Sequence, residues 1–363
     1  MARPDTVYLY SMSIKGRGTD QNPANRYAAS RSESVDDGWW QDETPQPSAT
    51  RVLDEKVRTI ITTNTSPDIP FDQSINPYRG CEHGCIYCYA RPSHAYWALS
   101  PGLDFETKII TKRKGPQLLA AALERRGYVC KPIAIGANTD PYQPVESSER
   151  ITRGVLEVLQ RHQHPFSLIT KSALILRDLD IIAPMAEQGL CSVAVSVTTL
   201  DNALKRKLEP RTASPSARLR TIRALSDAGV PVTMMVAPVI PFINDREIED
   251  ILAAGREAGA LSANYIFLRL PLEVAPLFES WLEAHFPDRA AHVMSLVRQS
   301  RDGRDYDPAF FERMRGNGRF AELISQRFRV AARRLGLESR GTDERFELDT
   351  SQFVQSHQQL ALF

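Results

Sequence analysis

From about residue 105 onward, apolar runs alternate with amphipathic segments, and this rhythm constrains the fold more than any other feature. Strands are expected in "FETKIITK", "KPIAIGANTD", "FSLITKS", "CSVAVSVTTLD", "VPVTMMVAPVIPFIND" and "SANYIFLRLPLE", with helices between them. Near-continuous apolar strands indicate a sheet that is buried on both faces. Strict alternation of strand and helix predicts parallel strands joined by right-handed crossovers. About six strands favour an α/β fold with a partial (β/α)6 TIM-type barrel over a full eightfold barrel.

We divide the chain into an irregular N-terminal arm, the barrel core, a helical Arg-rich extension and a flexible C-terminal tail. These regions span residues 1–65, 66–275, 276–345 and 346–363. The arm is polar and lacks apolar periodicity, and Trp39 and Trp40 either anchor it or lie in an exposed tail. The extension is assigned from residues 289–334, which hold eleven Arg and no Lys against five acidic residues.

Bulk composition and charge exclude few functions. Hydrophobic residues make up 42% and charged residues 25% of the chain, as in ordinary globular proteins. The formal net charge is +1, so the total charge does not indicate a partner. No apolar stretch is long enough to span a membrane, and the N-terminal apolar run is too short for a signal peptide. We therefore expect a cytoplasmic protein with no membrane association.

Three of the five cysteines lie in one short loop, "CEHGCIYC". They are Cys81, Cys85 and Cys88. In a reducing compartment such a cluster is expected to bind metal or to be catalytic, and its thiolates suit zinc or iron–sulfur chemistry. A closed zinc site needs four ligands, and His83 would have to reach the same ion within a very tight loop. Cys130 and Cys191 begin predicted strands at the opposite end of the sheet, where they are expected to pack in the core.

The pattern Cys-x3-Cys-x-aromatic-Cys, followed by alternating strands and helices, resembles the signature of the radical S-adenosylmethionine (SAM) superfamily. The resemblance implies a [4Fe–4S] cluster held by the three cysteines, which form the catalytic centre. It also implies reductive cleavage of SAM to methionine and a 5′-deoxyadenosyl radical, with Tyr87 on the adenine side of the site. An electron donor such as flavodoxin or ferredoxin is then required. Three cysteine ligands on a cluster of four irons leave one iron with an open coordination position, which catalysis needs. The alternatives for the cysteine loop are a zinc knuckle or three core cysteines.

Polar residues after two predicted strands are candidates for binding the methionine part of SAM. In the superfamily the loop after the second strand binds the methionine amino group, and "GANTDPYQPVE" places Asn138, Thr139 and Asp140 in that loop. Their carbonyl, hydroxyl and carboxylate oxygens suit an ammonium. Lys171 in "LITKS" is a candidate partner for the methionine carboxylate. The alternatives are a helix-capping loop closed by Pro141 and a solvated lysine.

Later strand ends supply the remaining cofactor candidates. Ser196 and Thr198 are placed to bond the ribose hydroxyls, and Asn244 lies near the predicted adenine position. Arg211, next to Glu209 in "LEPRTASP", suits a carboxylate because its guanidinium is a planar fork. Structural hydrogen bonds, core packing and a surface ion pair are the corresponding alternatives.

The stretches "SINPYRGCEHGCIYCYARPSHAYW", "GANTDPYQPVE" and "EPRTASP" resemble the spore-photolyase-like group, often labelled DNA repair photolyases, in its poorly characterised bacterial branch. The resemblance covers roughly residues 55–275 and implies lyase-type chemistry on nucleic acid, which the Arg-rich helices would support through phosphate contacts. In photolyases a cysteine after the second strand returns hydrogen to the product. That loop has no cysteine here, which leaves Tyr142, Tyr89 or Cys191 as donors. A protein or small-molecule substrate, or a non-catalytic zinc-stabilised nucleic-acid-binding module, are the alternatives.

The last five residues resemble the short peptide with which bacterial replication and repair proteins dock into the sliding clamp. The matching side chains are Gln359, Leu360, Leu362 and Phe363. A flexible polar leader that presents apolar anchors suits a preformed pocket. A terminal segment that folds back onto its own domain is the alternative.

Overall fold

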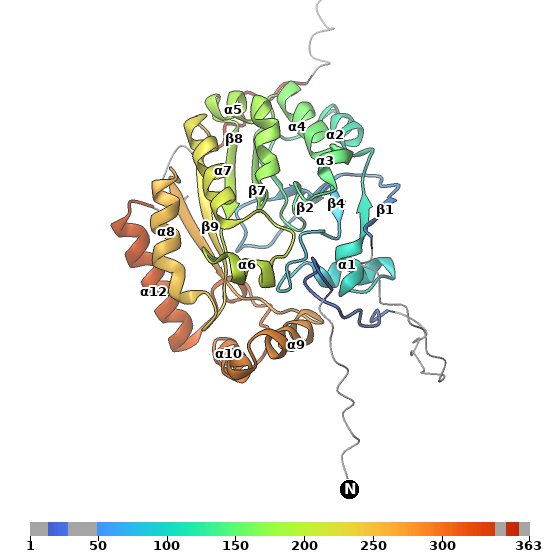
Figure 1. The fold of residues 1–363 in the computed structure, drawn as a ribbon. Coiled ribbons are helices and arrows are strands. Elements are labelled where there is room, and N and C mark those ends of the chain that lie inside the picture. Colours follow the sequence, from blue (N-terminus) through green and yellow to red (C-terminus); the bar gives the residue numbers. More distant parts are fainter. Residues whose placement is uncertain (1–13, 28–48, 338–345, 356–363) are drawn as a thin grey trace, which may run out of the picture.

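The computed structural model describes residues 14–27, 49–337 and 346–355, and it confirms a partial barrel (Figure 1). Its main sheet has seven strands in the order β10-β9-β8-β7-β6-β3-β2. Six of them are parallel, and β2 pairs antiparallel with β3 at one edge. The strands in chain order are β2 (Ile61–Thr63), β3 (Gln73–Ile75), β6 (Ile133–Ile135), β7 (Phe166–Thr170), β8 (Cys191–Ser196), β9 (Val232–Val239) and β10 (Ser262–Phe267).

Helices cover the outer face of this sheet, as Figure 1 shows. The main crossover helices are α2 (Gly115–Leu123), α4 (Ile151–Arg161), α5 (Leu179–Glu187), α7 (Pro215–Asp227) and α8 (Ile248–Glu257). Each turns an apolar stripe to the strands; in α4, Val155, Leu156 and Leu159 are fully buried. Ser214 caps α7 by accepting a hydrogen bond from Ala217 N at 3.2 Å. Within the described residues, no helix is both long and apolar enough to cross a membrane.

The first predicted barrel strand is wrong. Its residues form α1 (Leu103–Thr107) and then β5 (Lys108–Thr111), which belongs to a separate sheet of order β1-β5-β4. In that sheet β5 pairs with β1 (Arg51–Asp54) and β4 (Tyr78–Arg79). The first barrel strand is instead β3, directly before the cysteine loop. With three residues, β3 is too short to give a recognisable apolar run.

The arm expected to be irregular contains the strands β1 and β2, because the edges of both sheets offer unpaired backbone groups. Residues 14–27 do cross the core without regular structure, and we call them the N-terminal strap. Within the strap, Asn25 donates to the carbonyls of Ala95 and Leu99 at 2.8 and 2.9 Å. Trp39 and Trp40 lie outside the described residues.

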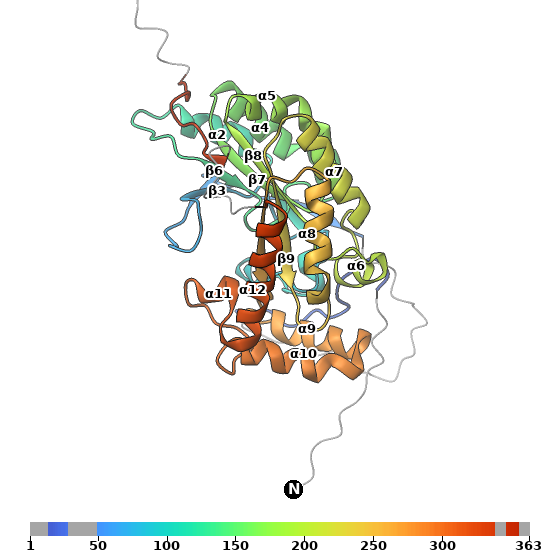
Figure 2. The ribbon, with the colours of Figure 1, turned by 90° about the vertical axis from the view of Figure 1, so that its left-hand side faces the viewer.

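The C-terminal extension is helical in the described residues. It comprises α9 (Val274–His285), α10 (Pro287–Gln299), α11 (Glu312–Arg315) and α12 (Gly318–Arg334). Figure 2 shows α12 lying beside α8, so that it extends the helical layer over β10. The rings of Phe328 and Tyr265 are 4.8 Å apart, and Arg327 pairs with Glu249 at 2.7 Å. The extension is therefore part of the packed core.

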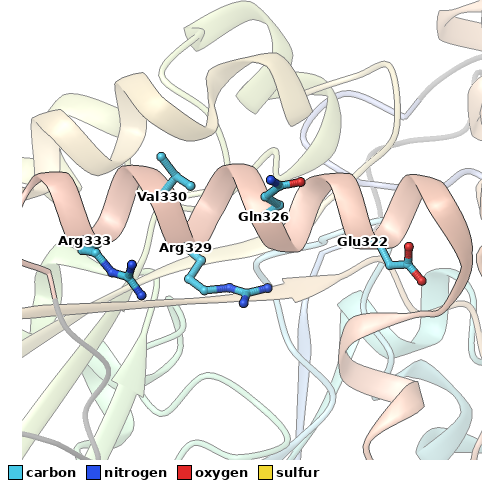
Figure 3. A pocket seen from close by; sticks show the side chains of 5 residues that line it. All are labelled: Glu322, Gln326, Arg329, Val330 and Arg333. Atoms are coloured by element: carbon cyan, nitrogen blue, oxygen red, sulfur yellow. The ribbon is translucent and has the colours of Figure 1, made fainter.

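The arginines of the extension divide into two groups. Some are structural: Arg301 is fully buried, and Arg298 pairs with Asp305 at 2.7 Å. Others extend from the outer surface of α12, where Arg329 and Arg333 border a shallow hollow of about 390 Å³ (Figure 3). The second group is placed to contact a partner.

The predicted flexible tail is wrong for residues 346–355, which dock at the amino ends of β6, β7 and β8. Phe353 packs against the rings of Tyr128 and His164 at 5.5 and 5.3 Å. Val354 N donates to the carbonyl of His162 at 2.9 Å. Phe346 is also buried, and Asp349 N donates to Gly189 O at 3.0 Å, so several contacts hold this polar segment in place. The predicted clamp-binding residues lie outside the described residues.

Candidate active site

The cysteine loop runs from β4 to the short helix η1 (Arg91–Trp97), close after the first barrel strand. Neighbouring segments hold its backbone from two sides. Cys81 N donates to Phe105 O at 2.8 Å, and Ile86 N donates to Leu208 O at 3.1 Å. The loop therefore sits between α1 and the end of α6 (Asn202–Leu208) as a fixed platform.

Two of the three thiols are buried, the third is half-buried, and all lie close enough to affect one another. All are free, and Cys81 and Cys85 are only 7% and 8% exposed. Burial raises the pKa of Cys81, and Asp140 together with Cys85 and Cys88 raises it further. Such thiols ionise when they bind a metal, so three soft ligands around one small volume fit an iron–sulfur cluster.

A single closed zinc site fits the loop less well. Among the residues that the structure describes, no three His, Cys, Asp or Glu side chains gather where one ion could bind. His83 turns its ring toward Asp140, with Nδ1 3.4 Å from a carboxylate oxygen. Tetrahedral zinc needs its thiolates about 2.3 Å from one ion. A [4Fe–4S] cluster binds each thiolate through a different iron, so its ligands need not converge.

Tyr87 belongs to a buried network centred on Glu209. Its phenol and the Thr198 hydroxyl both donate to one carboxylate oxygen, the latter at 2.7 Å. Arg218 donates to the other oxygen and to the carbonyl of Ser196 at 3.0 Å. Burial opposes ionisation of Glu209, but Arg218 and these hydrogen bonds outweigh it and lower the pKa of Glu209 to about 2. The network, which we call the Glu209 wall, ties the cysteine loop to β8 and α7.

Asn244 and Thr139 are already committed to structural hydrogen bonds. The Asn244 amide accepts from Ile240 N at 2.7 Å and donates to two backbone carbonyls at 2.7 and 2.9 Å. The Thr139 hydroxyl donates to Tyr78 O at 2.8 Å. Both side chains therefore shape the loops, and little of their hydrogen-bonding capacity is left for a cofactor.

Asp140 joins the loops that follow β6 and β7. One carboxylate oxygen accepts from Tyr142 N at 2.9 Å and from the Thr170 hydroxyl at 2.7 Å, and the other accepts from Lys171 N at 2.7 Å. Burial opposes ionisation, but His83 and these donors lower the pKa of Asp140 to about 2. Asp140 is thus an ionised brace between two strand ends.

Lys171 and Asn138 are two predicted residues whose polar ends remain available. Neither side chain has a hydrogen-bond or ion-pair partner within the described part of the chain. Burial raises the pKa of Cys85 and Cys88, whereas the Lys171 ammonium acts in the opposite direction on both. Lys171 therefore lies close to the thiols, and its ammonium also helps to lower the pKa of Glu209 without forming an ion pair with it.

Arg211 is exposed and lies against the outer side of the cysteine loop. Its guanidinium is 3.2 Å from a carboxylate oxygen of Glu82, and its backbone N donates to His83 O at 3.2 Å. Glu209, its neighbour in the sequence, is buried and paired with Arg218. The contact of Arg211 with Glu82 is the surface ion pair given as the alternative for this residue, and binding of a cofactor carboxylate by Arg211 stays a prediction.

Tyr89 and Arg269 meet beside the cysteine loop, a contact that the sequence did not suggest. Tyr89 is 39% exposed, and its ring centroid lies 4.6 Å from the guanidinium carbon of Arg269. The Tyr89 hydroxyl donates to Ala137 O, and Arg269 donates to the Tyr306 hydroxyl at 3.2 Å. Among the described residues, Arg269 Nε is buried without a partner. We call Tyr89, Arg269 and Tyr306 the mouth of the site; since Tyr89 and Arg269 are far apart in sequence, no local signal pairs them.

The three predicted hydrogen donors lie in different surroundings. Tyr142 is fully buried and donates to Asp178 at 3.0 Å. Cys191 is buried at the amino end of β8, away from the cysteine loop. Of the three, Tyr89 is the one that is exposed next to a cysteine of the loop.

Three thiols at the carboxyl end of a partial parallel barrel define an enzyme that handles a metal cluster. The family model of the Radical SAM superfamily matches residues 75–254 of this chain. The chain therefore belongs to this superfamily. Members use a [4Fe–4S] cluster and SAM, and both fit the buried thiols and the neighbouring Lys171.

Relatives of known sequence extend the match beyond the family region. An uncharacterised protein of Mycobacterium tuberculosis (strain ATCC 25618 / H37Rv) is 36% identical over 265 residues, which are 72% of this chain and 76% of the relative. An uncharacterised protein of Methanocaldococcus jannaschii is 26% identical over 214 residues, covering 59% of this chain and 76% of the relative.

A solved structure shares the fold. Spore photoproduct lyase complexed with dinucleoside spore photoproduct superposes with a TM-score of 0.56 at 15% identity, covering 78% of this chain and 79% of the other. The chain therefore shares its partial-barrel fold with that enzyme.

Proposed function

We propose that the protein is a radical SAM enzyme that acts on nucleic acid, in the manner of a DNA repair photolyase. In this superfamily one electron from the cluster cleaves SAM to methionine and a 5′-deoxyadenosyl radical, which takes hydrogen from the substrate. The proposal rests on the superfamily for this chemistry and on the mouth of the site for the substrate.

The mouth carries the substrate proposal. Tyr89 presents an exposed ring, and Arg269 stacks on it with no acidic partner among the described residues. Proteins bind unpaired nucleotides by stacking bases on aromatic rings while arginines contact phosphates. The fold shared with spore photoproduct lyase, which was solved with a dinucleoside spore photoproduct, supports the same substrate class.

The chain's own residues would divide the binding of SAM between them. Lys171 supplies the positive charge for the methionine carboxylate, and Asn138 supplies an amide oxygen for the methionine ammonium. Asp140 and Thr139 hold the loop that carries Asn138, as their hydrogen bonds indicate. Tyr87 is fixed by Glu209, so its ring rather than its hydroxyl would face the adenine.

Four further predicted residues support the site from behind. The Asn244 amide donates a hydrogen bond to the carbonyl of Thr198, and the carbonyl of Ser196 accepts a hydrogen bond from Arg218. Arg211 fixes Glu82 on the outer side of the loop. We propose positioning roles for these four residues, and contact with the ribose only for the Ser196 hydroxyl.

Tyr89 is the proposed donor that returns hydrogen to the product radical. It is exposed beside Cys88, whereas Tyr142 and Cys191 are buried in the core. The Tyr89→Phe variant is expected to keep SAM cleavage but to release less repaired product, with Tyr142→Phe as the matched control. Equal product yields from wild type and Tyr89→Phe would assign the donor elsewhere.

The central experiment follows deuterium from the substrate into 5′-deoxyadenosine. Reduced, reconstituted protein is given SAM with deuterated thymine dinucleotide lesions, deuterated peptides or deuterated small metabolites. Deuterium from the dinucleotide alone is the expected result. Transfer from a peptide or metabolite instead would reject nucleic acid as the substrate while leaving the radical chemistry in place.

Docking to a sliding clamp through Gln359, Leu360, Leu362 and Phe363 also remains a proposal. The match of these side chains to the clamp-docking peptide, after a polar leader sequence, supports it. Deleting Leu360 to Phe363 is expected to abolish binding to the bacterial clamp. An intact chain that does not bind the clamp would reject the idea.

A further inference from the structure

Two segments of the chain pack directly against the backbone of the cysteine loop on its outer side. The end of α6 and the residues after it bond to the loop through Leu208 O and through Arg211 N, at 3.1 and 3.2 Å. The N-terminal strap packs on the same loop through Gly18, where an added Cβ would collide with the carbonyl of Gly84. Figures 1 and 2 both place α6 and the blue strap on the same side of the molecule.

Hydrogen bonds fix the strap against this loop. Gly18 N donates to a Glu106 carboxylate oxygen at 2.9 Å, and Arg91 pairs with the other oxygen. Arg91 in turn donates twice to Cys85 O, at 2.9 and 3.1 Å. The strap is thus connected to a proposed cluster ligand through two buried charged side chains. Among the described residues, the strap forms the outer layer over that part of the cluster site.

This surface is positively charged. Both covering segments carry exposed or half-exposed cations beside the loop, namely Lys15, Arg17, Arg206, Lys207 and Arg211. The strap's other exposed cation, Arg26, is paired with Glu273 at 2.6 Å. Glu82 is 4% exposed and Glu106 and Glu209 are fully buried, so the acidic side chains at the surface of the two segments are Asp20 and Asp201, against five cations. Arg17 and Arg211 lie close enough for repulsion between them to help burial lower the pKa of Arg17. We call these five cations the basic patch.

We propose that the basic patch is the docking site for an acidic, low-potential electron-transfer protein that reduces the cluster. The inference rests on the reductive chemistry of the proposed function. On the inner side, the mouth and Lys171 are assigned to substrate and SAM, so the donor must approach from the outer side. In the step itself the donor loses one electron and the cluster gains one, with no bond made or broken. Opposite charge speeds such encounters and makes them sensitive to salt.

The test uses reconstituted full-length protein with flavodoxin hydroquinone as the donor, without SAM or nucleic acid. Lys15→Glu, Arg206→Glu and Lys207→Glu are combined in one variant, and none of these residues is assigned to the site itself. The matched control reverses three cations on α12, namely Arg319, Arg329 and Arg333; Figure 3 shows the last two on its outer surface. The measurements are the flavodoxin dissociation constant and the second-order rate of cluster reduction from its visible absorbance.

The patch variant is expected to bind flavodoxin at least tenfold more weakly and to be reduced at least tenfold more slowly at low salt, with the difference shrinking at high salt. The α12 control should stay within twofold of wild type, and dithionite should reduce all three proteins equally. A patch variant that matches wild type, or a loss confined to the α12 control, would overturn the proposal. So would a wild-type protein that accepts electrons from dithionite but not from flavodoxin. Because no substrate is present, the result does not depend on the nucleic-acid proposal.

Discussion

The Glu209 wall and the mouth lie on two sides of the same cysteine loop, and they differ in how fully their charged groups are paired. In the wall, Glu209 and Arg218 are fully buried, and hydrogen bonds satisfy the carboxylate from several directions. At the mouth, Arg269 is half-buried, and its Nε has no partner in the described residues. A saturated network can only hold the structure, whereas unsatisfied groups can bind a ligand. The difference separates the scaffold of the site from its recognition surface.

Removing the charge at the centre of the wall should have the largest effect on stability. Glu209→Gln leaves Arg218 buried without its ion partner, so the free energy of unfolding should fall by about 3–5 kcal/mol. Urea unfolding of the anaerobic apoprotein measures it. The control Glu249→Gln removes the exposed pair with Arg327 and should cost less than about 1 kcal/mol. Equal losses in the two variants would contradict the distinction.

As the pH falls, the Glu209 wall should lose its stabilising contribution before the mouth is affected. The pKa of Glu209 is lowered from 4.5 to about 2, so its carboxylate stabilises the fold fully above about pH 4.5. That contribution, roughly 3 kcal/mol, is lost as the pH falls from 4.5 toward 2. Across this range the free energy of unfolding should fall more steeply with decreasing pH for wild type than for Glu209→Gln. Parallel pH profiles would remove Glu209 as the cause.

Lys171→Met tests the free cation between the two regions. The variant should weaken SAM binding about 10–100-fold, or about 1.5–3 kcal/mol, because one charge-assisted hydrogen bond is lost. Equilibrium dialysis with the reconstituted protein measures the dissociation constant, and Lys56→Met on the surface is the control. A large loss of stability without a change in SAM affinity would instead place Lys171 in the scaffold.

Arg269→Gln should have the smallest effect, and only on ligand binding. The dinucleotide dissociation constant should rise about tenfold at low salt and less at high salt, since a phosphate contact is removed. The free energy of unfolding should change by less than about 0.5 kcal/mol. A dinucleoside without phosphate provides the control ligand, which both proteins should bind equally. If Arg269→Gln destabilises the fold strongly, the mouth is structural.

The sequence predicted the barrel where long apolar strands carried the signal. β7 to β10 each have at least five residues, most of them buried, and all four were expected. That β3, and not β5, is the first barrel strand could not be predicted. A strand of three residues gives no periodicity, and the pairing of β5 with β1 depends on distant backbone partners. The docked segment 346–355 was missed for a similar reason: its buried Phe346 and its packed Phe353 are separated by polar residues and give no periodicity.

Within the site, the sequence found the loop but not its partners. The cysteine spacing is local, so Cys81, Cys85 and Cys88 could be recognised directly. The partner of Glu209 could not, because helix α7 brings Arg218 back while Arg211, two residues away, points elsewhere. Ion pairs follow from tertiary geometry, and sequence proximity is a poor guide to them.

The docking of residues 346–355 at the amino ends of the strands also sets an orientation. Gln355 donates to the carbonyls of Leu123 and Arg125, at the pole of the barrel opposite the thiols. Anything attached to the chain beyond Gln355, such as a fluorophore, a surface linkage or another protein, would start from that pole. An immobilised enzyme held this way would present both its mouth and its basic patch to solution.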